Sequence, residues 1–180
     1  MGERTVYLVR HGQLDLRAYA EDQRTAGLTE MGREQARLTA ERLDALDVTA
    51  IHSSTITRAR QTAEIISGQH PHIAVEESDL LREVPNLNSV HFDAELRNRA
   101  EQAFAKYIRT TRAKHEIDIV ISHGNLIRYF AGRALGVAME SAATMDTSHC
   151  GVTQVHIATD GTIQVVCYNE TMHLPGEVRS

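Results

Sequence analysis

The stretch Thr5-Val6-Tyr7-Leu8-Val9-Arg10-His11-Gly12-Gln13 is a run of strand-forming residues that ends abruptly on polar ones. Residues 5–9 predict a buried strand, because β-branched, aromatic and apolar side chains follow one another without a break. Arg10 and His11 then place a cation and an imidazole at the carboxyl end of that strand. Gly12 lets the backbone turn away and lets another group come close. A functional role for His11 therefore requires partners from elsewhere in the chain.

The composition of the 180-residue chain is that of a globular protein. At this length we expect one domain spanning residues 1–180. The net charge of −5 argues against nucleic acid and membranes as partners. No apolar run approaches the roughly 20 residues of a spanning helix, and the first strand starts too early for a signal peptide. We therefore expect a cytoplasmic protein; its oligomeric state stays open, a homo-oligomer included.

Strand and helix patterns alternate along the rest of the chain. Residues 50–54, 73–76 and 117–122 have the composition of strands, and residues 14–27 read as a polar loop. Helices are predicted at residues 29–46, 56–67, 93–115 and 126–135, with Thr29 and Asp93 as N-caps and Gly136 after the last. Such alternation indicates an α/β domain with three layers, α/β/α, around a mainly parallel sheet.

The C-terminal part is predicted to add an antiparallel hairpin at the edge of the sheet. Residues 152–158 and 163–168 flank an Asp160-Gly161 pair, which is typical of a type I′ turn. With Thr159 opposite Thr162, Cys167 faces Gln154 rather than Cys150. We therefore expect both cysteines to be reduced.

Four polar segments are predicted to meet at one edge of the sheet, because ligands of open α/β sheets bind at the carboxyl ends of the strands. They are Arg10-His11-Gly12, Ser53-Ser54 with Arg58 beyond, Leu81-Arg82-Glu83, and Ser122-His123-Gly124. Arginines grip phosphate or carboxylate in a bidentate way, and two predicted helix N-termini point the same way. The sequence thus predicts an anion site that holds two histidines and a glutamate.

Histidine in such a site has a specific chemistry with phosphate. A neutral imidazole can attack phosphorus in line and form a covalent phosphohistidine. A carboxylic acid opposite can protonate the leaving oxygen and then activate water. The remaining task in phosphoryl transfer is to position the group and to neutralise its charge.

Three motifs resemble the histidine phosphatase (phosphoglycerate-mutase-like) superfamily and cover nearly the whole chain in order. They are Val9-Arg10-His11-Gly12-Gln13, Ser53-Ser54 followed by Arg58-Ala59-Arg60-Gln61-Thr62-Ala63, and Ser122-His123-Gly124-Asn125. Four further stretches are similar to one branch of this superfamily, the mitochondrial protein serine/threonine phosphatases. These stretches are residues 28–36, 52–59, 80–83 and 126–129.

The resemblance implies a role for six residues. His11 is the phosphorylated nucleophile, Glu83 the proton donor, and His123 a third catalytic residue that binds the phosphoryl group. Arg10, Arg58 and Gly124 form the substrate site. Neither a metal nor another cofactor is implied. The chain departs from the superfamily pattern at two places directly after Arg10-His11-Gly12. Gln13 replaces the more usual glutamate, and residues 14–17 lack an asparagine that many members carry.

Several residues compete with these assignments. Arg60 rivals Arg58, and the carboxylates Glu76, Glu77 and Asp79 rival Glu83. Ser53 and Ser54 fit a helix cap better than a phosphate ligand. His149 and His173 could line the rim of the site, although a surface position fits them better. His70 and His72 lack the further ligands that a metal site needs.

A phosphatase is the function we expect, acting on a phosphorylated protein or a small phosphorylated metabolite. The first alternative is a phosphoglycerate-type mutase, although such members are usually longer. The second is a non-catalytic module that binds phosphorylated ligands, for which the arginines alone would suffice.

Overall fold

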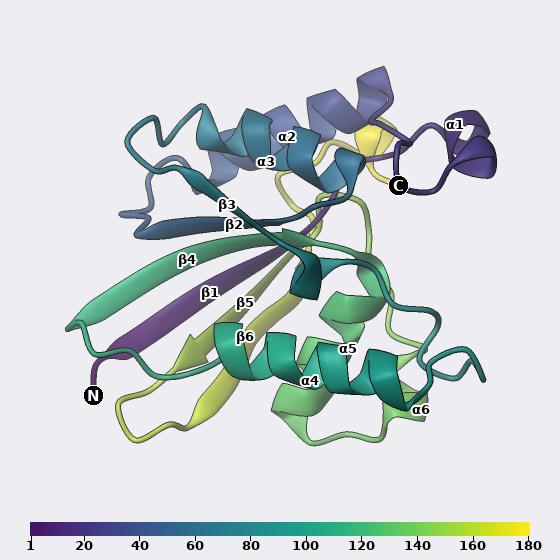
Figure 1. Ribbon diagram of the computed structural model, residues 1–180. Helices are drawn as coiled ribbons and strands as arrows, with labels where there is room; N and C mark the ends of the chain where they lie inside the picture. Colours follow the sequence, from purple (N-terminus) through teal and green to yellow (C-terminus); the bar gives the residue numbers. More distant parts are fainter.

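A six-stranded sheet lies between two layers of helices in the computed structural model, which describes residues 1–180 (Figure 1). The strand order is β3-β2-β4-β1-β5-β6. Parallel pairing joins β3, β2, β4 and β1, whereas β5 and β6 are antiparallel. The predicted three-layer α/β/α fold with an antiparallel C-terminal edge is confirmed. The strands are β1 (Glu3–Arg10), β2 (Ala50–Ser54), β3 (Val75–Ser78), β4 (His115–Ser122), β5 (Val152–Ile157) and β6 (Ile163–Glu170).

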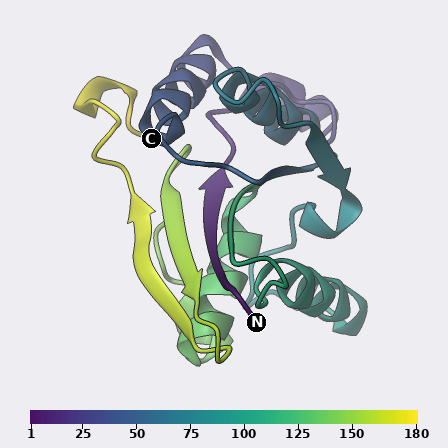
Figure 2. The same ribbon diagram turned by 90° about the vertical axis from the view of Figure 1, so that its left-hand side faces the viewer.

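The helices divide between the two faces of the sheet (Figure 1). One face carries α2 (Glu30–Leu43) and α3 (Thr57–Ser67); the other carries α4 (Ala94–Tyr107), α5 (Gly124–Leu135) and α6 (Met139–Ala142). A short helix, α1 (Leu16–Glu21), lies near the end of the first layer. Figure 2 shows the segment after β6, with the 3-10 turn Gly176–Val178, running up to α2. None of the helices has the length and the apolar composition needed to cross a bilayer.

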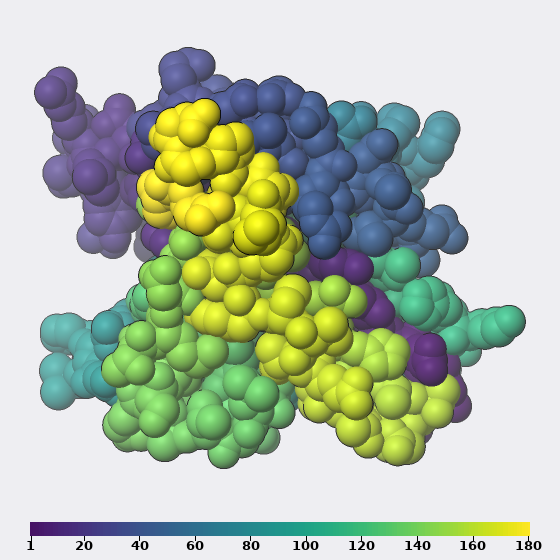
Figure 3. Space-filling view, turned by 180° about the vertical axis from the view of Figure 1, so that it is seen from behind, coloured from purple at the N-terminus to yellow at the C-terminus, as the bar shows by residue number.

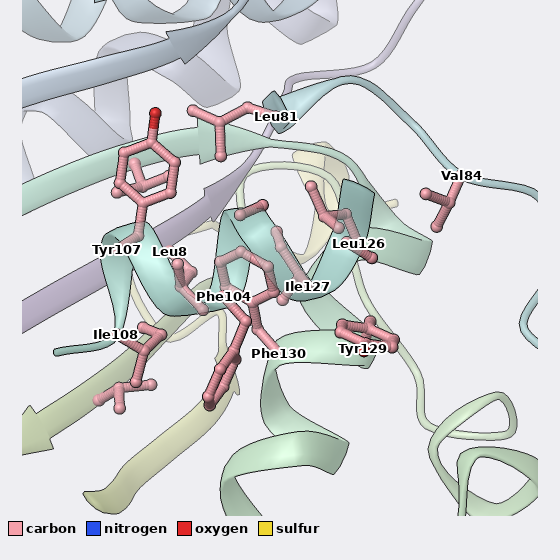
Figure 4. Close-up of a cluster of buried hydrophobic side chains, with 14 of the residues drawn as sticks. Leu8, Leu81, Val84, Phe104, Tyr107, Ile108, Leu126, Ile127, Tyr129 and Phe130 are labelled. Atoms are coloured by element: carbon pink, nitrogen blue, oxygen red, sulfur yellow. The ribbon is translucent and has the colours of Figure 1, made fainter. Parts of the chain in front are cut away.

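Side-chain alternation along the strands builds a separate core on each face. In β1, Val6 and Leu8 join the larger cluster, while Tyr7 and Val9 join the smaller one. The larger cluster lies between the sheet, α4 and α5, and Figure 4 shows Leu8 with Phe104 and Phe130 in it. Burial on both faces explains why the central strands read as uninterrupted apolar runs.

The predicted helix boundaries hold where a specific cap is present. The Thr29 hydroxyl accepts the Gly32 N–H at the start of α2, and the Asp93 carboxylate accepts the Leu96 N–H at the start of α4. Gly136, with φ +66°, ends α5 in the left-handed conformation that a glycine adopts without strain.

Three local predictions are wrong. Residues 14–27 are not all loop, because the Asp15 carboxylate caps α1. Helix α4 ends at Tyr107 rather than near residue 115, since His115 already pairs with Glu3 of β1. The strand expected at residues 73–76 is β3, two residues later, and a 3-10 turn at Asp79–Leu81 follows it.

The predicted pair of Cys167 and Gln154 is present, but the rest of the hairpin register and the turn type differ from the prediction. Ile157 pairs with Ile163 rather than with Gln164, and irregularities on either side of Gln154 shift the register. Cys167 faces Gln154, and both cysteines are free thiols. A type I′ turn needs positive φ at both central residues, whereas Gly161 alone has it here, at +89°. The Asp160 carboxylate instead accepts the Thr162 N–H at 2.9 Å.

Candidate active site

The carboxyl ends of β1, β2 and β4 bring together the residues predicted to meet. Arg10 pairs with Ser122 in the sheet, and the backbone N–H of His11 donates to the Ser122 carbonyl at 3.0 Å. The ring centroids of His11 and His123 are 5.1 Å apart. Arg58, in the first turn of α3, lies between the two rings and contacts both.

Two hydrogen bonds set the protonation of the buried His11 ring. Its Nδ1 lies 2.8 Å from the Gly12 carbonyl, and its Nε2 accepts the Nε–H of Arg58 at 3.0 Å. The proton therefore sits on Nδ1, and the lone pair of Nε2 faces the arginine. Burial, followed by the charges of His123, Arg58 and Arg10, holds the pKa of His11 well below its usual value. The ring is neutral at physiological pH, as a nucleophile must be.

Gly12 is required because of the close approach between this turn and α2. A Cβ atom at Gly12 would lie 2.4 Å from the carbonyl oxygen of Gly32. The N–H of Gly12 donates to Thr62 of α3 at 3.1 Å. Both contacts fix the backbone directly after His11, so the imidazole has little freedom to turn away.

Arg58 is buried and uses every guanidinium nitrogen within the protein. Besides His11, it donates to the Gln23 carbonyl at 2.8 Å and lies 3.3 Å from Nδ1 of His123. Its guanidinium also lies over the Tyr19 ring, 5.5 Å from the centroid. Residues 14–27 thus supply two contacts that no periodicity or motif in the sequence indicates.

His123 is fully buried, and Ser54 orients it. The Nε2 of His123 lies 2.8 Å from the Ser54 hydroxyl, which also accepts the Ile56 N–H at 3.3 Å. Because Arg58 donates to Nδ1, the proton of His123 lies on Nε2. Burial is the main reason why the pKa of His123 lies well below its usual value. Ser54 does not cap α3 as expected, because Ile56 is the N-cap and has no side-chain cap; instead, Ser54 accepts the Ile56 N–H and contacts a candidate site residue.

Arg10 presents one free donor to the site. Its Nη1 donates to the Thr147 carbonyl, and its Nη2 lies 3.1 Å from Nε2 of His149. The Nε–H is buried and has no partner. A Cβ at Gly124 would lie 3.5 Å from this nitrogen, so Gly124 borders the free donor directly. A buried donor without a partner costs about 1–3 kcal/mol, which an anionic ligand would relieve.

Glu83 lies in a turn that three elements hold in place. Arg99 of α4 donates to the carbonyls of Arg82 at 2.7 Å and of Glu83 at 2.9 Å. The Ser122 hydroxyl donates to the Leu81 carbonyl, and the Asn125 amide to the Val84 carbonyl. Burial raises the pKa of the Glu83 carboxyl, whereas the nearby Arg10 and Arg58 oppose that shift. A carboxyl with a raised pKa is suited to donate a proton.

The competing side chains are engaged elsewhere. Arg60 pairs with Glu77 at 2.9 Å on the exposed side of α3. Glu76 lies 3.3 Å from His52, and Asp79 accepts from the Thr55 hydroxyl at 2.6 Å. The His173 side chain does not lie at the surface, since it is only 5% exposed and its Nε2 lies 3.0 Å from the Thr39 hydroxyl.

His149 is half-buried and lines a cleft beside His11, which is the rim position that the sequence left as the less favoured alternative to the surface. Its ring centroid is 5.6 Å from that of His11, and burial lowers its pKa to about 4. It belongs to the loop between α6 and β5, which carries no recognisable motif. Only the tertiary structure brings it to the site.

Two clefts reach the site. One, of about 440 Å³, contains Arg58 and Glu83 and is lined further by Tyr19, Glu21, Asp22, Gln23, Arg24, Ile56 and Arg82. The other, of about 560 Å³, is lined by Gln13, Leu14, Asp15, Leu16, Arg17, Thr29 and His149. A bound molecule therefore has room to extend beyond the anion pocket, the site formed by Arg10, His11, Arg58 and His123.

The fold and this pocket agree with what comparison with known proteins shows. The chain belongs to the histidine phosphatase superfamily (branch 1), whose family model matches residues 6–88 and 92–171. It is 34% identical over 191 residues to the mitochondrial serine/threonine-protein phosphatase PGAM5 of Xenopus tropicalis. It is also 34% identical over 188 residues to PGAM5 of Homo sapiens. The resemblance inferred from the motifs is confirmed.

These alignments cover most of the chain but only part of each relative. They include 97% and 96% of this chain, and 67% of the Xenopus and 64% of the human protein. A crystal structure of phosphoglycerate mutase from Plasmodium falciparum is 25% identical, with a TM-score of 0.71 over 98% of this chain and 96% of that one.

The expected cytoplasmic location is overturned by the same comparison. Both PGAM5 relatives are mitochondrial proteins. The expectation rested on the lack of an apolar leader and of a spanning segment, and neither property assigns a compartment.

Proposed function

We propose that this protein is a phosphatase that hydrolyses phosphomonoesters through a phosphohistidine at His11. The observation that carries the proposal is the state of the His11 ring. It is neutral, its Nδ1 is tied to Gly12, and its Nε2 lone pair faces Arg58. Arg10 adds a buried donor without a partner beside it.

In the first step, Nε2 of His11 attacks phosphorus and the bond from phosphorus to the ester oxygen breaks. The departing oxygen takes the electron pair of that bond and the proton of Glu83. The cleft that contains Glu83 and Arg58 receives the leaving alcohol. Arg10, Arg58 and His123 bind the phosphoryl oxygens and stabilise the charge on them.

In the second step, the Glu83 carboxylate accepts a proton from water while the water oxygen attacks phosphorus. The bond from phosphorus to Nε2 breaks, and its electron pair returns to His11. Inorganic phosphate is released and Glu83 is protonated again. Neither a metal nor a cofactor takes part in this scheme.

The substrate class is a phosphorylated protein or a small phosphorylated metabolite. The names of the PGAM5 relatives favour phosphoserine and phosphothreonine in proteins. Two clefts beside the anion pocket give a peptide or a bulky leaving group room to bind. A mutase is the second candidate, favoured by the similarity to the Plasmodium phosphoglycerate mutase. A ligand-binding module without turnover is the third.

One panel of assays separates these candidates. The kcat/KM values for phosphopeptides, sugar phosphates and glycerate phosphates are measured with wild type, His11→Ala and, as a control, the exposed His72→Ala. We expect phosphate release by wild type and His72→Ala only. Label from the substrate should appear on His11 in an acid-labile, base-stable form. Retention of phosphate on the substrate would favour the mutase, and binding without release the module.

A further inference from the structure

His149 connects the anion pocket to a distant part of the chain. Its Nε2 lies 3.1 Å from Nη2 of Arg10. Its Nδ1 lies 3.0 Å from the hydroxyl of Ser180, and its backbone N–H donates to the Ser180 carbonyl at 2.7 Å. The ring therefore bridges a candidate phosphate ligand and the segment that follows β6.

Gln35 of α2 holds the other side of this bridge. Its side-chain N–H groups donate to the Ser180 hydroxyl at 2.9 Å and to the Val178 carbonyl at 2.6 Å. Its amide oxygen accepts the Gln13 N–H at 2.8 Å, two residues from His11. Gln35 is fully buried. Figure 3 shows the C-terminal segment lying over the α2 region.

This network selects one tautomer of His149. Because Arg10 can only donate, Nε2 of His149 must be the acceptor, and the proton lies on Nδ1. The Ser180 hydroxyl is then an acceptor for both His149 and Gln35. With Nη1 bound to Thr147 and Nη2 to His149, the guanidinium of Arg10 is anchored by two of its nitrogens, and its Nε–H stays buried without a partner beside Gly124.

The backbone around His149 is shaped by close contacts. Cys150 and Asn169 have positive φ, +55° and +51°, and no other non-glycine residue does. The Asn169 amide oxygen accepts the Ser148 N–H at 2.8 Å. A Cβ at Gly151 would lie 2.2 Å from that oxygen, so the loop and β6 pack without room for a side chain. Such conformations persist only where the surroundings enforce them.

We infer that His149 is a positioning residue that holds Arg10 in its phosphate-binding orientation, and that Ser180 and Gln35 in turn hold His149. The inference rests on the proposed function only in taking Arg10 as a phosphate ligand. The absence of hydrolysis would not affect it, since the binding of inorganic phosphate reports on Arg10 without turnover.

The test is a double-mutant cycle read out by calorimetric titration with inorganic phosphate. We expect His149→Leu, which keeps bulk but has no acceptor, to raise the Kd roughly tenfold. His149→Gln restores an acceptor and should recover most of that loss. In the Arg10→Ala background, His149→Leu should have no further effect. Ser180→Ala should raise the Kd by a smaller factor, and His72→Ala should leave it unchanged.

Two results would overturn the inference. An unchanged Kd in His149→Leu would mean that Thr147 alone orients Arg10. Equal losses from His149→Leu with and without Arg10 would mean that His149 acts on phosphate by itself. If His149→Leu does not fold, the cycle is run with His149→Gln and Ser180→Ala. The inference then requires that Ser180→Ala raises the Kd in the wild-type background and adds nothing to the effect of Arg10→Ala, while His149→Gln stays near wild type; an unchanged Kd for Ser180→Ala in the wild-type background would overturn it. The kcat/KM values of the same variants report separately whether the proposed hydrolysis occurs.

Discussion

The Nε–H of Arg58 donates to Nε2 of His11 across 3.0 Å, so the lone pair proposed to attack phosphorus is occupied in the free protein. A phosphoryl group that enters must take over this donor before the nitrogen can react. Arg58 thus has two roles in the proposed reaction: it keeps His11 oriented while the pocket is empty, and it binds a phosphoryl oxygen when the pocket is filled.

Replacement of Arg58 by lysine should lower kcat/KM by about two to three orders of magnitude. Lysine keeps the charge, but it cannot contact His11, His123 and the Gln23 carbonyl with one planar group. Arg60→Lys on the same helix is the matched control and should keep wild-type activity. Similar losses in both variants would contradict the assignment of Arg58.

Replacement of Glu83 by glutamine should lower kcat by roughly two orders of magnitude or more for an alkyl phosphate. The loss should be much smaller for p-nitrophenyl phosphate, whose leaving group departs without a proton. Glu77→Gln, at a position paired with Arg60, serves as the control. Equal losses for the two substrates would show that Glu83 does not act as an acid.

Replacement of Arg99 by leucine should reproduce part of the Glu83 defect at a distance. Arg99 binds the carbonyls of Arg82 and Glu83, which belong to the peptide groups on either side of the Glu83 Cα, so its loss frees the carboxyl to move. We expect kcat to fall about tenfold, because a small misplacement of a catalytic group is costly. Arg97→Leu removes a neighbouring arginine of α4 and should leave kcat unchanged even if it lowers the melting temperature.

Stability should fall as the pH drops below about 6.5, the pKa of histidine in an unfolded chain. The pKa values of His11 and His123 lie well below that, chiefly because burial disfavours the charged ring. Below pH 6.5 the unfolded state therefore binds protons that the folded state excludes. The free energy of unfolding falls progressively until the pH reaches the folded-state pKa values of His11 and His123.

Urea denaturation at pH 7 and pH 5.5 measures this effect. His11→Gln should lose about 1 kcal/mol less stability than wild type between the two pH values. His72→Gln should follow wild type, since that side chain is exposed. An identical pH dependence in His11→Gln would mean that His11 is not held neutral.

Much of the fold can be predicted from local sequence patterns. The apolar runs of β1 and β4, the Thr29 and Asp93 caps and the stop at Gly136 are all readable, because each depends on neighbours a few residues away. The predictions failed where a distant partner decides. His115 joins β4 because β1 offers Glu3 as a partner, and no property of residues 108–115 alone shows this.

The candidate site divides in the same way. Five residues of the site could be predicted from the sequence, because the carboxyl ends of parallel strands converge and the motifs mark those ends. They are Arg10, His11, Arg58, Glu83 and His123. The sequence did not indicate Tyr19, Gln23 or Arg99, and it offered His149 only as the less favoured of two alternatives. Each of these residues reaches the site from a loop or helix whose position depends on packing.

The sequence by itself thus determined the class of fold and the chemical groups of the site, through short-range patterns that residues impose on their neighbours. Only the tertiary structure decided how those groups are held: which nitrogen of His11 carries the proton, that the Arg10 Nε–H has no partner, and how Ser180 contacts His149. These are contacts between residues far apart in the chain, and they form only when the sheet and its helix layers are packed together.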